Sequence, residues 1–187
     1  CHYDVFSLTS ITYVDVPIGY TGTYFCGNKL KSSGSCGSSC TWTYYWDTNK
    51  LVISGSGTMT DYSQTSMPWN SKKTSITSIE IGGVSNVGSY MCNGCTSLTS
   101  VTFTSSSTTA INQYAFYGCT NLNSITFSTG LKTIGDYSFS NTKFTSFTIP
   151  DSVTSIGNYV FDSCSSLQSI TFGSGLSSMG YNPVINC

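Results

Sequence analysis

The stretch SFTIPDSVTSIGNYVFDSCSSLQSITF, residues 146–172, holds most of one unit of an internal repeat, from its first strand onward, and the first strand of the next unit. On both sides of this stretch the same pattern recurs, five times in all between Ile76 and Cys187. The leading apolar residues follow one another at steps of 22, 24, 22 and 23 residues, and they are Ile76, Leu98, Leu122, Phe144 and Leu167. A fixed period of this length is typical of a solenoid with one repeat per coil. Since one coil cannot bury its apolar side chains alone, we expect the coils to stack around a shared core.

Each unit begins with an alternating pattern that predicts a short β-strand with one buried face. The expected strands cover residues 79–81, 101–103, 125–127, 147–149 and 170–172. A turn and a second apolar pair follow, and the pair is mostly followed by glycine, as in Ile156-Gly157. Because glycine tolerates positive φ, we interpret this glycine column as a left-handed corner of the backbone. A column of tyrosines comes next, on a segment long enough only for a turn or a 3₁₀ turn.

The outward residues of the predicted strands form two columns of mostly hydroxyl-bearing side chains. Parallel pairing of successive coils at a spacing of about 4.8 Å would align these residues across the sheet. The resulting surface is flat and nearly uncharged, and it is the candidate binding face. Its residues are Ser78, Glu80, Ser100, Thr102, Ser124, Thr126, Ser146, Thr148, Ser169 and Thr171.

Charged residues make up only 8% of the 187-residue chain, and the formal net charge is -1. All seven basic residues are lysines. Proteins that bind nucleic acid neutralise phosphates with Lys and Arg, so this composition argues against a nucleic-acid partner. No apolar run approaches the roughly 20 residues of a membrane-spanning helix, and no membrane span is expected.

Nine cysteines indicate an oxidising environment. The disulfide candidates lie outside the repeats, and their pairing stays open; they are Cys1, Cys26, Cys36 and Cys40. A second set occupies one column of the repeat, where we expect buried thiols packed as small apolar side chains. This set is Cys95, Cys119, Cys164 and Cys187. Cys92 and Cys95 form a C-x-x-C motif, for which we favour packing or a local disulfide over a redox or zinc site, because no second ligand pair exists.

Catalytic residues are not expected in this chain. His2 is the only histidine, and it lies next to the N-terminus, outside the repeats. The carboxylates are scattered over different coils and mostly occupy turns, where Asp accepts hydrogen bonds from backbone amides. The sequence therefore predicts neither an enzyme nor a bound cofactor or metal.

Residues 146–172 closely resemble the BspA-like, or Treponema-type, leucine-rich repeat, whose units read approximately L-x-x-I-x-I-P-x-x-V-x-x-I-G-x-x-A-F-x-x-C. Residues 33–70 are similar to the capping segment that precedes the repeats in this family, with Trp42 and Trp69 at the positions of a hairpin and a lid. The sequence departs from the pattern at Cys92, at Thr142 and at 182–184. The resemblance implies a right-handed, leucine-rich-repeat-like solenoid with a parallel β-sheet on one face and short turns or 3₁₀ segments on the other.

Three segments are expected: a β-prone extended arm over 1–32, a cap over 33–75, and five repeats of 22–24 residues over 76–187. The resemblance also implies a secreted or cell-surface, non-catalytic adhesion module that binds a protein or glycan on another cell or in the matrix. The alternative is a structural protein that forms a homo-oligomer, filament or surface layer. Self-assembly would use the solenoid ends, the β-prone arm and possible intermolecular disulfides, since the cysteine count is odd.

Overall fold

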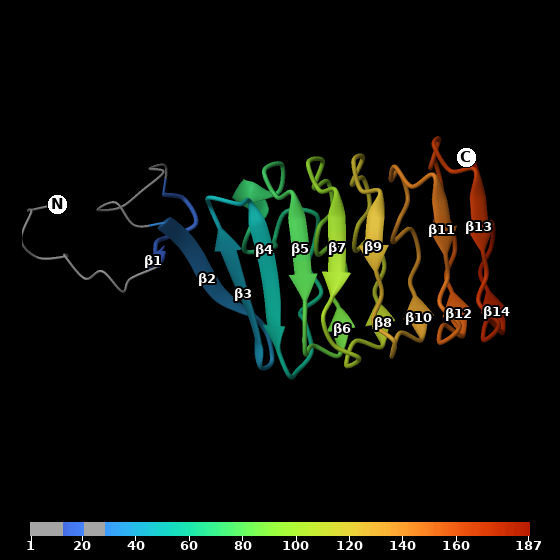
Figure 1. Cartoon of the computed structure of the whole chain (residues 1–187), viewed down its shortest axis with the longest axis horizontal. Coiled ribbons are helices and arrows are strands. Elements are labelled where there is room, and N and C mark those ends of the chain that lie inside the picture. Colours follow the sequence, from blue (N-terminus) through green and yellow to red (C-terminus); the bar gives the residue numbers. More distant parts are fainter. Residues whose placement is uncertain (1–12, 21–28) are drawn as a thin grey trace, which may run out of the picture.

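The computed structural model describes residues 13–20 and 29–187, and it is a β-solenoid whose coils follow one another along the long axis of the molecule (Figure 1). Within the described residues the only helical element is one 3₁₀ turn, η1 (Asn70–Lys72), which precedes the first coil. The outer side of each coil consists of turns alone. The predicted solenoid, with strands on one face and short turns on the other, is therefore confirmed.

Each coil contributes one strand to the front of the molecule and one shorter strand to the back. We call the front strands together the front sheet. The front strands are β5 (Ser78–Ile81), β7 (Ser100–Phe103), β9 (Ser124–Thr126), β11 (Ser146–Thr148) and β13 (Ser169–Thr171). The back strands are β6 (Asn86–Val87), β8 (Ala110–Ile111), β10 (Thr133–Ile134), β12 (Ser155–Ile156) and β14 (Ser178–Met179). The front strands lie within one residue of their expected positions. The back sheet is not predicted by the sequence, because strands of two residues carry no alternating pattern.

Neighbouring coils are paired in parallel and in register. On the front, Ile79 lies opposite Val101 and Val101 opposite Ile125, with all three side chains facing the interior. The five back strands form one continuous parallel sheet in the order β14-β12-β10-β8-β6. The front strands do not form one sheet, since β11 and β13 pair only with each other.

The segment before the repeats extends the front sheet. β2 (Lys29–Gly37), β3 (Cys40–Tyr45) and β4 (Lys50–Gly55) form an antiparallel meander, and β4 then pairs in parallel with β5. Part of the predicted arm, β1 (Tyr13–Asp15), pairs in parallel with β2 of the same chain. β2 itself crosses the expected boundary between arm and cap at 32/33. The other arm residues, 1–12 and 21–28, lie outside the described residues.

Two tryptophans cover the apolar core at the cap. Trp69 is fully buried, and its indole Nε1–H donates a hydrogen bond to the carbonyl oxygen of Met91 at 3.0 Å. The ring of Trp42 meets that of Trp69 edge to face, with 5.8 Å between ring centroids. Because the buried indole has a hydrogen-bond acceptor, it closes the core without leaving an unpaired donor.

The glycine column is not a left-handed corner, and this expectation is wrong. Backbone φ is positive instead two residues later, at Tyr90 (57°), Tyr114 (57°), Tyr137 (53°) and Tyr159 (54°). Glycine is required for a different reason: a Cβ atom on Gly135 would lie 2.7 Å from the backbone nitrogen of the preceding coil's Gln113. The column therefore permits close approach of coil backbones rather than an unusual φ.

Candidate functional site

The candidate binding face is present as two rows of side chains that run across the front strands. In the inner part of the sheet, Ser100 lies opposite both Ser78 and Ser124, and Thr102 lies opposite both Glu80 and Thr126. On the last two coils the same rows continue, with Ser146 opposite Ser169 and Thr148 opposite Thr171. Ser78, Glu80 and Ser100 are half-buried, whereas the other seven members of the rows are exposed. The structure thus brings all ten predicted face residues onto the front sheet.

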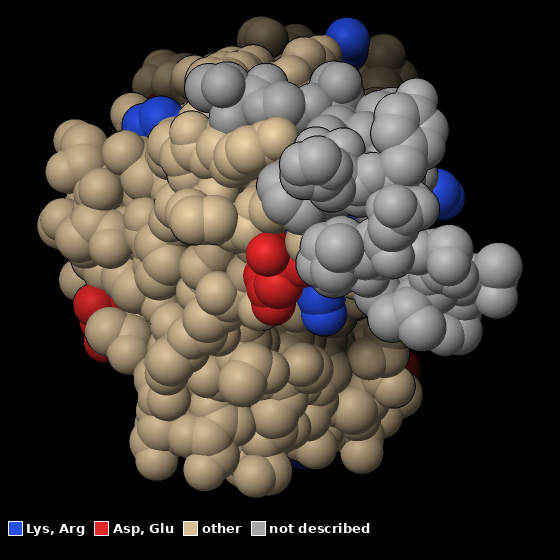
Figure 2. Space-filling model, turned by 90° about the vertical axis from the view of Figure 1, so that its left-hand side faces the viewer, with Lys and Arg blue, Asp and Glu red and all other residues tan. Residues whose placement is uncertain are grey.

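Charge is scarce on and around this face. Glu80 is the only charged member of the rows, and its Oε1 lies 2.6 Å from Nζ of Lys50 in an ion pair. Figure 2 shows the N-terminal end of the molecule, where the few charged side chains are scattered over an otherwise uncharged surface. The face therefore offers hydrogen-bonding groups and almost no net charge.

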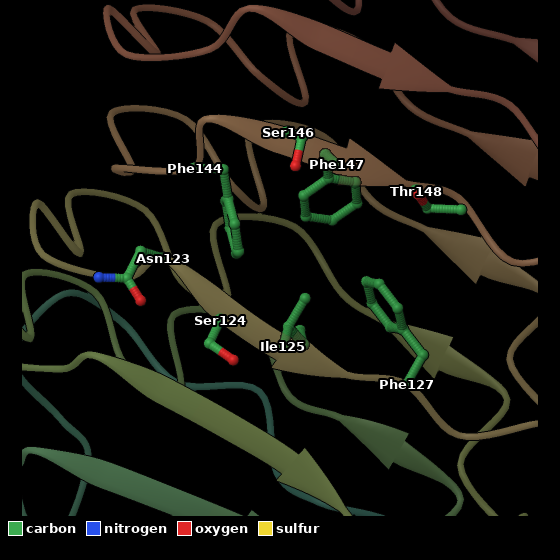
Figure 3. Close-up of a pocket in the computed structure, with 8 residues that line it drawn as sticks. All are labelled: Asn123, Ser124, Ile125, Phe127, Phe144, Ser146, Phe147 and Thr148. Carbon is green, nitrogen blue, oxygen red and sulfur yellow. The ribbon is translucent and has the colours of Figure 1, made fainter.

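The front sheet is interrupted between β9 and β11. β9 is the last strand of the seven-stranded front sheet, β11 belongs to a separate two-stranded sheet, and no ladder hydrogen bond joins these two described strands. Figure 1 shows β9 and β11 farther apart than any other neighbouring front strands of the coils. A cavity of about 260 Å³ fills the interruption, and we call it the slot (Figure 3). Its lining residues are Asn123, Ser124, Ile125, Phe127, Phe144, Ser146, Phe147 and Thr148.

Bulky side chains explain why the sheet opens at this point. The fourth coil carries Phe144 and Phe147 at the two interior positions where the other coils carry leucine, isoleucine or valine. Their rings are perpendicular, with 4.7 Å between centroids, and Phe147 also packs against Phe127 of the third coil at 5.5 Å. Interiors are close-packed, so the additional ring volume separates the front strands while the back strands stay paired.

Two disulfides are present among the described cysteines. Cys36 and Cys40, two of the predicted candidates, are joined with a Cα–Cα distance of 5.0 Å. Cys92 and Cys95 are also joined, with 5.4 Å between their Cα atoms, and both residues are fully buried. Cys95 is therefore not a free thiol of the buried column. The candidates Cys1 and Cys26 lie outside the described residues.

The remaining cysteines of the column are free thiols, two of them buried. Burial raises the pKa of Cys119 to about 12 and also raises the pKa of Cys164. These thiols therefore stay protonated near neutral pH and are poor nucleophiles. Cys187 differs from the expectation of burial: it is exposed, because it lies on the last coil of the described chain and no coil covers it.

The carboxylates hold neighbouring coils together rather than forming an acid–base pair. Oδ1 of Asp61 accepts hydrogen bonds from the backbone N–H of Ser89 at 2.6 Å and from Nδ2 of Asn112 at 2.8 Å. Oδ1 of Asp151 likewise accepts from the backbone N–H of Ser174 at 2.7 Å. These backbone hydrogen bonds lower the pKa of both carboxyl groups, since they favour the charged form. Within the described residues no group of His, Cys, Asp or Glu is arranged to hold a metal ion.

The tyrosine column forms a stack along the outer edge of the coils. Ring centroids lie 4.8 Å apart from Tyr90 to Tyr114 and 5.0 Å apart both from Tyr114 to Tyr137 and from Tyr137 to Tyr159. The planes are nearly parallel, at 10°, 3° and 19°. Partial burial and the neighbouring phenols raise the pKa of Tyr114. The repeat alignment predicts the column, but neither the stacking nor the positive φ of its members.

The last coil exposes an apolar patch. Four of its large apolar or aromatic side chains are more than 40% exposed: Phe172 (42%), Met179 (49%), Tyr181 (66%) and Val184 (41%). We call these four residues the terminal patch. In the part of the chain that the structure describes, no helix is long and apolar enough to cross a membrane.

Among known protein families, the chain matches the family described as "BspA type Leucine rich repeat region (6 copies)" over residues 85–187. This match covers more than half of the chain. The six copies belong to the description of the family, whereas the described part of this chain has five pairs of front and back strands, one pair for each coil. No match to a curated protein was found.

Several solved structures are similar to this chain, and two of them are leucine-rich repeat proteins of bacteria. A leucine-rich repeat protein from Eubacterium ventriosum ATCC 27560 is 30% identical, with a TM-score of 0.68 over 79% of this chain and 41% of that protein. A leucine-rich repeat protein from Bacteroides ovatus ATCC 8483 is 21% identical, with a TM-score of 0.55 over 74% of this chain and 34% of that protein. The second likeness shows the fold alone. The chain spans less than half the length of either protein.

Proposed function

The chain belongs to the BspA-type leucine-rich repeat family, and we propose that it is a non-catalytic, extracellular or cell-surface binding module whose front sheet recognises a protein or glycan. The observation that carries this proposal is the pair of in-register rows on the front sheet. Rows of hydroxyl groups at strand spacing offer hydrogen-bond donors and acceptors over an extended surface. Solenoid proteins use extended surfaces of this kind to bind large partners.

The disulfides support a location outside the cytoplasm. Cys36–Cys40 and Cys92–Cys95 are both formed in the structure. Disulfides persist in oxidising compartments and are rare in the reducing cytosol. The resemblance to BspA-like repeats points to the same location.

A matched pair of variants tests the front-sheet proposal. Thr102→Lys places a charge in the middle of the exposed rows on β7, and Thr133→Lys places the same charge on an exposed residue of the back strand β10. Binding of the purified protein to immobilised matrix proteins and to a glycan array is then measured. We expect Thr102→Lys to weaken binding at least about tenfold and Thr133→Lys to leave it unchanged. Failure to bind any of these probes, or equal loss in both variants, would contradict the proposal.

A further inference from the structure

The slot places two unpaired strand edges opposite each other. β9 ends the seven-stranded sheet and β11 begins the two-stranded sheet, so each presents one edge toward the other. Strand edges carry backbone donors and acceptors that pair readily with an additional strand. In Figure 3 the ribbons of both strands border the labelled residues, with the side chains of Ile125 and Phe147 directed between them.

The hydrogen bonds that β9 and β11 make on the side away from the slot identify the backbone groups that face the slot. The N–H of Ser124 donates to Thr99 in the preceding coil, and the N–H of Ile149 donates to Thr171 in the following coil. Because successive residues of a strand point their backbone groups to opposite sides, alternate residues face the slot. On β9 this residue is Ile125, and on β11 they are Ser146 and Thr148.

The lining of the slot restricts the chemistry of an occupant. None of its eight lining residues carries a charge, so a phosphate, a metal ion or a charged peptide would find no counter-charge there. The floor is apolar: Phe144 and Phe147 fill the interior below it, and Ile125 and Phe127 are only partly buried. An added strand would therefore need small side chains facing inward and polar side chains facing outward.

We propose that the slot accepts one extended, uncharged segment of a partner protein as an additional β-strand, which pairs with β9 and β11 and completes the front sheet. This proposal deepens the proposed function, since it rests on the front sheet being the binding surface. It names the backbone edges, in addition to the hydroxyl rows, as the contacts that hold the partner.

A peptide binding experiment tests the slot directly. The probe is the fluorescently labelled peptide Thr-Gly-Thr-Ala-Thr-Gly-Thr, whose small residues alternate with polar ones, and binding is followed by fluorescence anisotropy. Thr148→Pro removes an N–H that faces the slot, while the N–H of Ile149, which bonds to β13, is kept. Thr148→Val is the matched control, because it removes only the hydroxyl group. We expect Thr148→Pro to weaken peptide binding at least about tenfold and Thr148→Val to change it less than about twofold.

A second measurement keeps the proposal testable if Thr148→Pro does not fold. The same peptide, N-methylated at alternate residues, cannot complete the ladder and should not bind the unmodified protein. Bound unmodified peptide should also slow hydrogen exchange of the Ile125, Ser146 and Thr148 amides. Equal binding of both peptides, no binding of the unmodified peptide, or no slowing at these amides would overturn the proposal. Thr133→Lys, on the back strand β10, should leave peptide binding unchanged. The peptide assay reports on the slot and the assay with matrix proteins and glycans reports on the hydroxyl rows, so failure of the one proposal is distinguishable from failure of the other.

Discussion

Restoring the ordinary repeat residues in the fourth coil should close the slot. The double variant Phe144→Leu/Phe147→Ile gives this coil the side chains found at the same positions in the other coils. Without the two phenyl rings, β9 and β11 should approach each other and form ladder hydrogen bonds like those between β7 and β9. The front sheet would then run without interruption along the whole solenoid.

The expected change in the free energy of unfolding is small because two effects oppose each other. Both phenylalanines are buried, and about six side-chain carbons are removed, which costs about 4–5 kcal/mol at ~0.8 kcal/mol per buried carbon. Closing the sheet adds up to about four backbone hydrogen bonds, which contribute about 0.5–1.5 kcal/mol each. The variant should therefore lie between about 3 kcal/mol less stable and about 2 kcal/mol more stable than the unmodified protein.

A control variant removes the same atoms where no strand edge is free. Phe103 and Phe116 are both buried in the second coil, whose front strand β7 is paired on both sides. Phe103→Ile/Phe116→Leu should therefore lose the full 4–5 kcal/mol or more, since no new ladder hydrogen bond can form there. Urea denaturation compares the two variants, and amide hydrogen exchange reports on Ile125, Ser146 and Thr148 individually. The reasoning is refuted if both variants lose equal stability and these amides exchange as fast as in the unmodified protein.

Three further predictions concern the rest of the chain. Hydrogen bonding lowers the pKa of Asp61 in the folded protein. The ionised Asp61 carboxylate therefore stabilises the fold above the unfolded pKa of about 3.9, and this stabilisation is lost as the pH falls through the lower folded pKa. Urea titrations at several pH values should show that Asp61→Asn loses less stability on acidification than the unmodified protein does. Gly135→Ala should lower the free energy of unfolding by about 1–3 kcal/mol, because the new Cβ meets backbone atoms of Gln113. Gly19→Ala, with open space around the new Cβ, is the control and should not lower it. An unchanged urea midpoint for Gly135→Ala would contradict the close-approach explanation. Iodoacetamide should label Cys187 in the native protein and Cys119 only after unfolding, because Cys119 is buried and its pKa is raised to about 12. Mass spectrometry of the labelled peptides identifies the modified residue. Labelling of Cys119 in the native protein would show that its coil opens readily.

The sequence predicts the parts of the fold that depend on polarity. Alternation of apolar and hydroxyl residues places Val101 inside and Thr102 outside, and the period of the repeat aligns Thr102 with Thr126. Both features follow from burial of one face of each strand, which a pattern of polar and apolar letters records directly. The front strands and the hydroxyl rows are therefore predictable from single residues.

The features that the sequence does not predict depend on size and on close contacts between coils. Phe147 and Ile170 are equally apolar, so a polarity pattern treats them alike, yet only the phenylalanine separates β11 from its neighbour. Gly135 is explained equally well by positive φ or by close approach until the preceding coil is placed against it. The slot and the stacked tyrosines arise from packing between coils, and no single unit contains that information.

The unbroken back sheet has a mechanical consequence. A protein that connects two surfaces is stretched along its length, and tension in this molecule would pass from coil to coil through whatever bonds cross each junction. At the other junctions of the coils both sheets share the force, but between the third and fourth coils the front ladder is missing. The force there passes through the pairing of β10 with β12, the phenyl contacts and the hydrogen bonds of the turns, such as those from the N–H of Lys143 to Leu122 and from the N–H of Asn141 to Asp162. Under load the solenoid should therefore yield first at this junction, giving slack as two intact halves instead of unravelling from its ends.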